Sequence, residues 1–216
     1  MLLIVTKILT GIASHVPLLR KCLDERNIPY VITRKCDPEI IRRKDITGII
    51  IPGSPFRIRP NEIQDNIELY YLYHLSKLPV LGICHGCQFL MLYYGGELEQ
   101  YNNYWSGSKD IELDLSRDRI FKGEERLQKI HVYFHDLPVV TPAAKKAGVR
   151  EIAWITRFRD GHRRACAFEF EKNRVYGVMF HAEAKKNTRS IIYNFYDNVC
   201  ISSASASVSA SASASA

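Results

Sequence analysis

Short apolar runs alternate with amphipathic segments through the first half of the chain. Each apolar run has the length of a buried strand and is closed by polar residues, glycine or proline, whereas the segments between them place apolar residues near one helical face. The predicted order is a strand within 1–9, a helix over 12–27, strands at 30–33 and 48–51, a helix over 61–76 capped near Asn61, and a strand at 79–83. Strands and helices that alternate at this spacing predict βαβ units and a parallel sheet covered on both faces.

The pattern changes after Gly96, and the second half is rich in strands. Residues 111–115 alternate between apolar and polar, as a half-exposed strand does. Further strands are expected near 129–134, 151–157, 165–170 and 174–180, and a closing helix is expected over 185–199. The sequence therefore predicts an α/β fold over residues 1–200, with a mostly parallel, mixed central sheet, helices on both faces and a β-rich second half.

Residues 201–216 differ in composition from the rest of the chain. From Ser202 onward the sequence is a Ser/Ala repeat in which Val208 is the one larger apolar residue. Such a segment buries too little surface to offset the entropy of ordering it. We therefore expect a disordered tail without catalytic chemistry.

Composition limits the class of protein. The 216 residues carry a formal net charge of +7 and give a pI near 9.1, but zinc-finger spacing, a dense basic arm and an aromatic-basic sheet motif are missing, so no nucleic-acid partner is expected. Six scattered cysteines favour a reducing, cytoplasmic setting over a disulfide framework. Lys7 interrupts the apolar start, which indicates a strand rather than a signal peptide, and no run has transmembrane length, so no membrane is expected.

One stretch places a single cysteine between a strand and a helix. The strand is predicted at 79–83 and the helix ends at Gly95-Gly96, with Cys84 between them and Gly82 and Gly86 on either side. A side chain on such a sharp turn lies at the end of the sheet, beside the positive end of a helix dipole. This placement exposes the sulfur and favours the thiolate, as a nucleophile requires.

The same stretch resembles the nucleophile segment of class I glutamine amidotransferases. The run Gly82-Ile83-Cys84-His85-Gly86-Cys87-Gln88 matches Gly-x-Cys-x-Gly-x-Gln, and Val175 to Glu183 is similar to the family's strand ending in Phe-His-Pro-Glu. The two segments have the order and about the separation found in the family, and the resemblance covers most of residues 1–200. Within the family it is strongest to the stand-alone glutaminase subunits of GMP synthases. It implies a flavodoxin-like fold of the class I amidotransferase type.

The resemblance also implies a triad of Cys84, His181 and Glu183 that hydrolyses glutamine through a thioester. Cys84 would attack the amide carbon, His181 would take and return the proton, and Glu183 would orient the imidazole. Residues i and i+2 of an extended segment point the same way, so His181 and Glu183 can lie on one side of a strand end. No cofactor and no metal ion is expected.

Supporting roles follow from the same resemblance. The backbone N–H of His85 and the Gly53-Ser54 turn, which resembles the family's Gly-Gly-Pro loop, are expected to form the oxyanion hole. Gln88 is expected to contact bound glutamine. Gly107, in Trp105-Ser106-Gly107-Ser108, lies where the family has another substrate-contacting loop.

Three departures from the family pattern affect the expected geometry. Ala182 replaces the usual proline between the histidine and the glutamate, and Ser54 replaces a glycine, which matters if that position needs a positive φ. The run ending in His135-Asp136 is similar to the family's strand ending in Ser-His-x-Asp but lacks one residue of that pattern. None of these changes removes a reacting group, although small misplacements of reacting groups lower rates strongly.

The sequence leaves alternatives open. A γ-glutamyl hydrolase or peptidase would use the same chemistry on another substrate, and a catalytically silent homologue would only bind a partner. Cys84-His85-Gly86-Cys87 alone would also fit a redox pair or half of a zinc site, although a zinc site needs about two more ligands. The sequence contains no P-loop motif, so ammonia for synthesis would pass to a separate ATP-pyrophosphatase (synthetase) subunit. The resemblance implies that this synthesis is of GMP from XMP.

Overall fold

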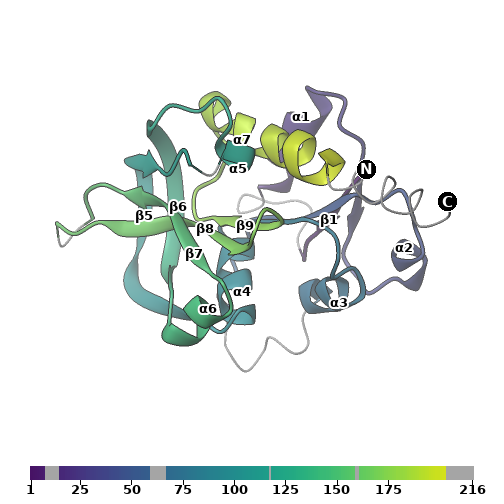
Figure 1. Ribbon diagram of the computed structural model, residues 1–216, viewed down its shortest axis with the longest axis horizontal. Helices are drawn as coiled ribbons and strands as arrows, with labels where there is room; N and C mark the ends of the chain where they lie inside the picture. The colour runs from purple at the N-terminus through teal and green to yellow at the C-terminus, as the bar shows by residue number, and fades with distance from the viewer. Residues whose placement is uncertain (8–14, 59–66, 117, 159–160, 203–216) are drawn as a thin grey trace, which may run out of the picture.

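A nine-stranded sheet runs through the protein, with strand order β2-β1-β3-β4-β9-β8-β7-β5-β6 (Figure 1). The computed structural model describes residues 1–7, 15–58, 67–116, 118–158 and 161–202. Within these ranges the strands are β1 (Leu2–Val5), β2 (Tyr30–Thr33), β3 (Gly48–Ile51), β4 (Val80–Ile83), β5 (Glu97–Leu113), β6 (Leu127–Val139), β7 (Arg150–Ile155), β8 (Arg164–Glu171) and β9 (Val175–Val178). The mixed α/β fold predicted from the sequence is confirmed.

The parallel half of the sheet explains the uninterrupted apolar runs. β2, β1, β3, β4 and β9 pair in parallel, and every residue of β1, β3, β4 and β9 is buried. Strands covered on both faces need apolar side chains at consecutive positions, so they show no alternation. The edge strand β2 is only partly buried. The carboxyl ends of these strands form the edge where ligands bind in open sheets of this type.

Helices cover both faces of the sheet, as Figure 1 shows, with α1 and α7 on one face and α3 and α4 on the other. The helices are α1 (Val16–Asp24), α2 (Pro38–Ile41), α3 (Ile67–His74), α4 (His85–Tyr93), α5 (Asp118–Phe121), α6 (Pro142–Lys146) and α7 (Arg189–Asn194). The predicted cap at Asn61 lies outside the described residues. The expected single helix over 185–199 is wrong in detail, because a 3-10 turn at Lys186–Thr188 precedes α7 and a π-helix at Phe195–Ile201 follows it.

The antiparallel half contains the largest difference from the sequence prediction. β5 and β6 form a long hairpin, whereas the sequence pattern marked only 111–115 and 129–134. The pairing register shifts between Gln100 and Trp105, and β6 lies at the edge of the sheet. A hairpin with this much exposed surface needs apolar side chains at only some positions, so its early part shows no regular alternation.

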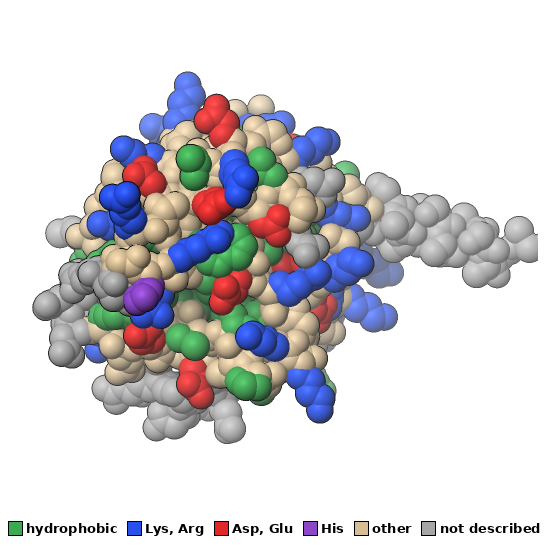
Figure 2. Space-filling model, turned by 60° about the vertical axis from the view of Figure 1, so that its left-hand side comes forward, with side chains coloured by type: hydrophobic (Ala, Val, Ile, Leu, Met, Phe, Trp, Pro, Cys, Tyr) green, Lys and Arg blue, Asp and Glu red, His purple; other side chains and the backbone are tan. Residues whose placement is uncertain are grey.

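Basic and acidic side chains are intermixed over the antiparallel half of the molecule. Figure 2 shows Lys and Arg interspersed with Asp and Glu on this face. Arg126 and Arg163 both pair with Glu112, and Lys129 lies 3.8 Å from Asp110. The charge of +7 is therefore not gathered into one basic patch on this face.

Two further sequence predictions concern membrane-spanning segments and the C-terminal tail. None of the helices in the described ranges has both the length and the apolar character to cross a membrane. The expected start of the disordered tail at residue 201 is wrong, because Ile201 ends the π-helix and Ser202 is also described. Residues 203–216 lie outside the described residues, so disorder there stays a prediction.

Candidate active site

Cys84 stands on a strained turn between β4 and α4. Its backbone angles, φ 51° and ψ −101°, are outside the regions that non-glycine residues favour, and strain of this kind persists only where the surroundings enforce it. The Cys84 N–H donates to the carbonyl of Val178 at 2.7 Å, which holds the turn against β9. Gly82 packs on the backbone of Gly86, so that a Cβ on either glycine would collide with neighbouring backbone. The two glycines therefore permit the turn, and the turn presents the sulfur at the end of the sheet.

His181 and Glu183 follow the neighbouring strand β9. The Nδ1 atom of His181 lies 2.9 Å from Oε1 of Glu183, and both side chains are at most 2% exposed. The backbone is a tight turn rather than the extended segment expected from the i, i+2 spacing. In this turn the N–H of Ala182 donates to the carbonyl of Phe180 at 3.0 Å, a bond that the usual proline could not make. The departure at Ala182 therefore adds a bond to the turn.

The imidazole of His181 is strongly biased towards its protonated form. Burial lowers its pKa, but the adjacent Cys84 and Glu183 outweigh burial and raise the pKa to about 10. Nδ1 faces the carboxylate, while Nε2 is buried without a conventional hydrogen-bond partner in the described part of the chain. A buried imidazolium between the Cys84 sulfur and a carboxylate is the arrangement that cysteine hydrolases use to activate sulfur.

We predict that the imidazole of His181 titrates with a midpoint near pH 10. Because this value lies above the ordinary 6.5, the stability that protonation contributes is full below about pH 6.5 and is lost as the pH rises through about 10. Glu183→Gln should lower the midpoint, since the carboxylate is one of its causes. Proton NMR titration of the imidazole resonance that is missing in His181→Ala measures it. A midpoint near 6.5 in the wild type would contradict this assignment.

The proposed oxyanion donors lie beside the triad. A Cβ on Gly53 would stand 2.8 Å from Cε1 of His181 and 3.7 Å from Cβ of Cys84, so this turn packs directly on both residues. Among the described residues the non-glycine positions with positive φ are Asn27, Cys84 and Asn173, so Ser54 bears no left-handed strain. The N–H of His85 opens α4, where the helix supplies no acceptor for it.

The His85 side chain connects the two halves of the expected oxyanion hole. Its Nδ1 lies 3.0 Å from the carbonyl oxygen of Phe56, in the loop that follows Gly53 and Ser54. A carbonyl can only accept, so Nδ1 carries the proton. The Nε2 atom faces the buried carboxylate of Glu68 at 3.8 Å. His85 thus ties the start of α4 to the loop after β3.

Gln88 and Gly107, the two residues expected to contact the substrate, lie in different parts of the structure. Gln88 is buried, and its Nε2 donates to the backbone carbonyl of Asp136 at 2.7 Å, which anchors α4 on β6. Gly107 is not in a loop, since the structure places it within β5 with φ 101°, opposite Val132. The next residue of β6, Tyr133, accepts a 3.5 Å bond from the Cys84 thiol through its carbonyl. Gly107 is therefore one strand removed from the sulfur, and contact of either residue with glutamine stays a prediction.

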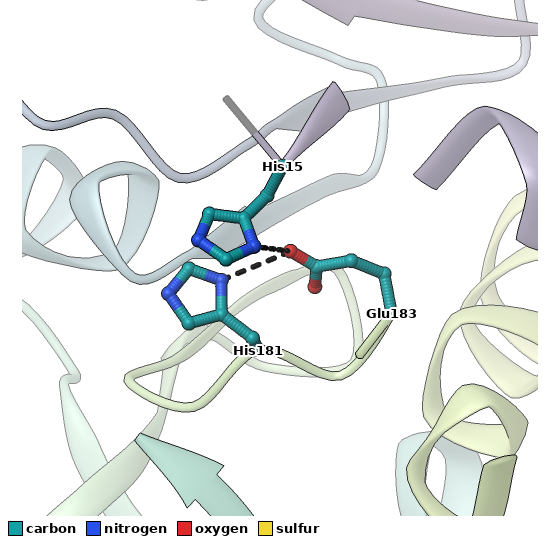
Figure 3. Close-up of side chains that lie close together, drawn as sticks. All are labelled: His15, His181 and Glu183. Atoms are coloured by element: carbon teal, nitrogen blue, oxygen red, sulfur yellow. Dashed lines mark hydrogen bonds and ion pairs between the residues drawn. The ribbon is translucent and has the colours of Figure 1, made fainter. Parts of the chain in front are cut away.

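A second histidine, His15, lies against His181, and no sequence pattern pointed to it. Figure 3 shows the His15 ring stacked on His181. The ring centroids are 3.6 Å apart and the ring planes are inclined by 20°. Its Nδ1 is 3.6 Å from the same carboxylate oxygen, Oε1 of Glu183. His15 lies about 165 residues from the triad histidine along the chain and belongs to no motif, so no local signal could reveal the contact.

One cluster of side chains could in principle hold a metal ion. Its three potential ligand atoms, from His15, His181 and Glu183, lie within 4.8 Å of one another. The lone pair of an imidazole nitrogen lies in the plane of its ring. Two rings stacked at 20° therefore point their nitrogens along nearly parallel planes, whereas a tetrahedral ion needs ligands that converge on it. His181 Nδ1 is also occupied by the carboxylate. The cluster fits a hydrogen-bonded triad with a stacked ring better than a metal site.

The second cysteine of the Cys-x-x-Cys run belongs to the core. Cys87 is fully buried against Gly177 of β9, and burial raises the pKa of its thiol well above the usual value. A redox pair needs a partner sulfur that becomes a thiolate and is accessible. The surroundings of Cys87 disfavour the redox alternative.

Fold, nucleophile turn and buried His-x-Glu pair together define a class of protein. The family model described as glutamine amidotransferase class-I matches residues 12–199, and the chain belongs to this family. It is 28% identical over 174 residues to a GMP synthase (glutamine-hydrolyzing) of Lactobacillus gasseri, an alignment that covers 77% of this chain. The chain spans only 30% of that relative's length.

Two further proteins match over most of their own length. The chain is 27% identical to a protein of Methanopyrus kandleri that is named as one subunit of a GMP synthase (glutamine-hydrolyzing), over 80% of this chain and 85% of that protein. A crystal structure from Thermoplasma acidophilum, described as a putative GMP synthase subunit, superimposes with a TM-score of 0.70 at 20% identity, covering 93% of this chain and 94% of the other. The last comparison shows the shared fold.

Proposed function

We propose that this amidotransferase hydrolyses glutamine to glutamate and ammonia with Cys84, His181 and Glu183. The observation that carries the proposal is His181, buried between the thiol of Cys84 and the carboxylate of Glu183 with its pKa raised to about 10. This arrangement places the sulfur nucleophile and a protonated acid together at the same edge of the sheet.

Cys84 and His181 act directly on the substrate, and Glu183 orients the imidazole. The Cys84 thiolate attacks the side-chain amide carbon of glutamine, and the oxygen that becomes negative is bound by the N–H groups of His85 and the Gly53-Ser54 turn. His181 donates its proton to the nitrogen as the C–N bond breaks, so ammonia leaves and a thioester remains. His181 then accepts a proton from water, the hydroxide attacks the thioester, and glutamate leaves with the thiolate restored.

An electrophilic glutamine analogue should label Cys84 before the other five cysteines. Cys84 lies at a helix N-terminus beside His181, whereas burial raises the pKa of the thiols of Cys22, Cys87, Cys166 and Cys200. Cys36 is exposed and serves as the internal competitor. Peptide mapping by mass spectrometry measures the order of labelling. Equal labelling of Cys36 and Cys84 would contradict the assignment, and a haloacetamide without the glutamine moiety is the control for general thiol reactivity.

The acceptor of the ammonia forms the second part of the proposal. We propose that a separate ATP-pyrophosphatase subunit receives it for the synthesis of GMP from XMP. The support is the relative of Methanopyrus kandleri, which is named as one subunit of a GMP synthase and of which this chain covers 85%. Binding of the synthetase would order the loop of Gly53 and Ser54, and the isolated chain should be slow because a misplaced oxyanion donor lowers kcat by roughly 10²–10³-fold.

Steady-state kinetics with the synthetase subunit titrated in tests this function. We expect ATP, XMP and an ATP-pyrophosphatase subunit to raise kcat for glutamine and to yield GMP. Glutamine hydrolysis without stimulation and without GMP would remove the GMP assignment while leaving the glutaminase. Faster hydrolysis of γ-glutamyl peptides than of glutamine would favour the γ-glutamyl hydrolase alternative.

A further inference from the structure

We propose that His15 is a positioning residue of the triad, whose ring stacks on His181 and fixes the plane of the catalytic imidazole. The inference rests on the proposed function, since it concerns the same site. It adds a fourth residue, from the opposite end of the chain, to the three that the family pattern supplies.

A hydrogen bond to Glu183 cannot by itself orient the His181 ring. The torsion that turns an imidazole about its Cβ–Cγ bond is broad and has no sharp minimum. The 2.9 Å bond from Nδ1 to Glu183 fixes one direction within the ring but leaves rotation about that direction free. A ring stacked at 3.6 Å removes this rotation, because tilting His181 would drive it into His15. Together the two contacts determine where Nε2 points.

The backbone of His15 is held at the start of α1. It precedes α1, and its carbonyl accepts the N–H of Leu19 at 3.0 Å. Arg189 of α7 connects this helix to the triad segment, since it pairs with Glu25 just after α1 and donates from Nε to the carbonyl of Glu183 at 3.3 Å. Arg189 thus links the C-terminal end of α1 to the residue that hydrogen-bonds His181.

The charges around the stacked pair allow the contact. Burial, followed by the charge on His181, lowers the pKa of His15 to about 4, against the opposing effect of Glu183. His131, whose carbonyl accepts the N–H of His181, has its pKa lowered by burial and by the same charge. At neutral pH the imidazolium of His181 is therefore flanked by neutral histidines, so His15 adds no positive charge beside it.

Two substitutions of His15 distinguish a loss of ring stacking from a general loss of protein stability. His15→Asn removes the ring but places a polar amide near the position of Nδ1, which faces the carboxylate of Glu183. His15→Phe keeps a stacking ring but leaves the buried carboxylate of Glu183 without that polar neighbour, which costs stability. Stability alone predicts that Phe is the more damaging change, whereas positioning predicts that Asn is. His74→Asn, at an exposed helical histidine, is the matched control.

We expect His15→Asn to lower kcat for glutamine by about tenfold to a hundredfold with KM within threefold, and His15→Phe to stay within about threefold of the wild type. Wild-type kcat in His15→Asn, or equal losses in both variants, would overturn the inference. Proton NMR gives a readout without turnover: the downfield Nδ1–H signal of the His181–Glu183 bond should persist in His15→Phe and broaden in His15→Asn. If the wild type fails to hydrolyse glutamine even with its synthetase, the proposed function fails, while the NMR comparison still decides the role of His15.

Discussion

Cys84→Ala should lower glutamine hydrolysis by roughly 10⁴-fold or more, because the residue that forms the thioester is removed. His181→Ala should have nearly the same effect, since the two act as a unit. Glu183→Ala should lose less, because it orients the imidazole without touching the substrate. Initial rates of glutamate formation measure all three variants in the presence of the synthetase.

The fold should survive these changes, so the loss can be assigned to chemistry. Cys36→Ala removes an exposed cysteine and should keep the wild-type rate, which makes it the matched control for the loss of a thiol. Thermal unfolding of Cys84→Ala should remain cooperative. Retention of most glutaminase activity by Cys84→Ala would rule out the proposed mechanism.

Gly53→Ala should lower kcat by about 10²-fold or more while changing KM much less. The new Cβ would lie 2.8 Å from Cε1 of His181, closer than carbon atoms approach without a shift. The His181 ring cannot move away without losing its stacking on His15 or its hydrogen bond to Glu183. The turn or the imidazole must then move, and either shift displaces a group that acts in the transition state.

Gly161→Ala controls for the general effect of adding a methyl group to a glycine. Gly161 has φ 78°, so alanine is strained there, but its Cβ would meet nothing within 4 Å. This variant should lose stability and keep kcat. If Gly53→Ala keeps the wild-type kcat, the turn after β3 does not support the reacting groups as proposed.

The sequence by itself determined the parts of this protein that depend on neighbouring residues. The parallel strands were predictable because β1, β3 and β4 are buried on both faces and so are continuously apolar. The nucleophile turn was predictable because a strand, a sharp turn and a helix need glycines at Gly82 and Gly86. The family pattern then connected this turn with the His-x-Glu segment.

Only the tertiary structure decided what surrounds the imidazole. Gly53, His15 and His181 come from three elements that are distant in the sequence and meet at the carboxyl edge of the sheet. The early part of β5 was hidden for a related reason, since its long pairing with β6 needs little regular burial. The pattern of apolar and polar residues in a segment reflects which of its side chains face solvent and which face the core. The effect of a stacked ring, or of a glycine without a Cβ, depends instead on a contacting residue that is distant in the sequence. The packing of the chain therefore determined which side chains hold His181 in place.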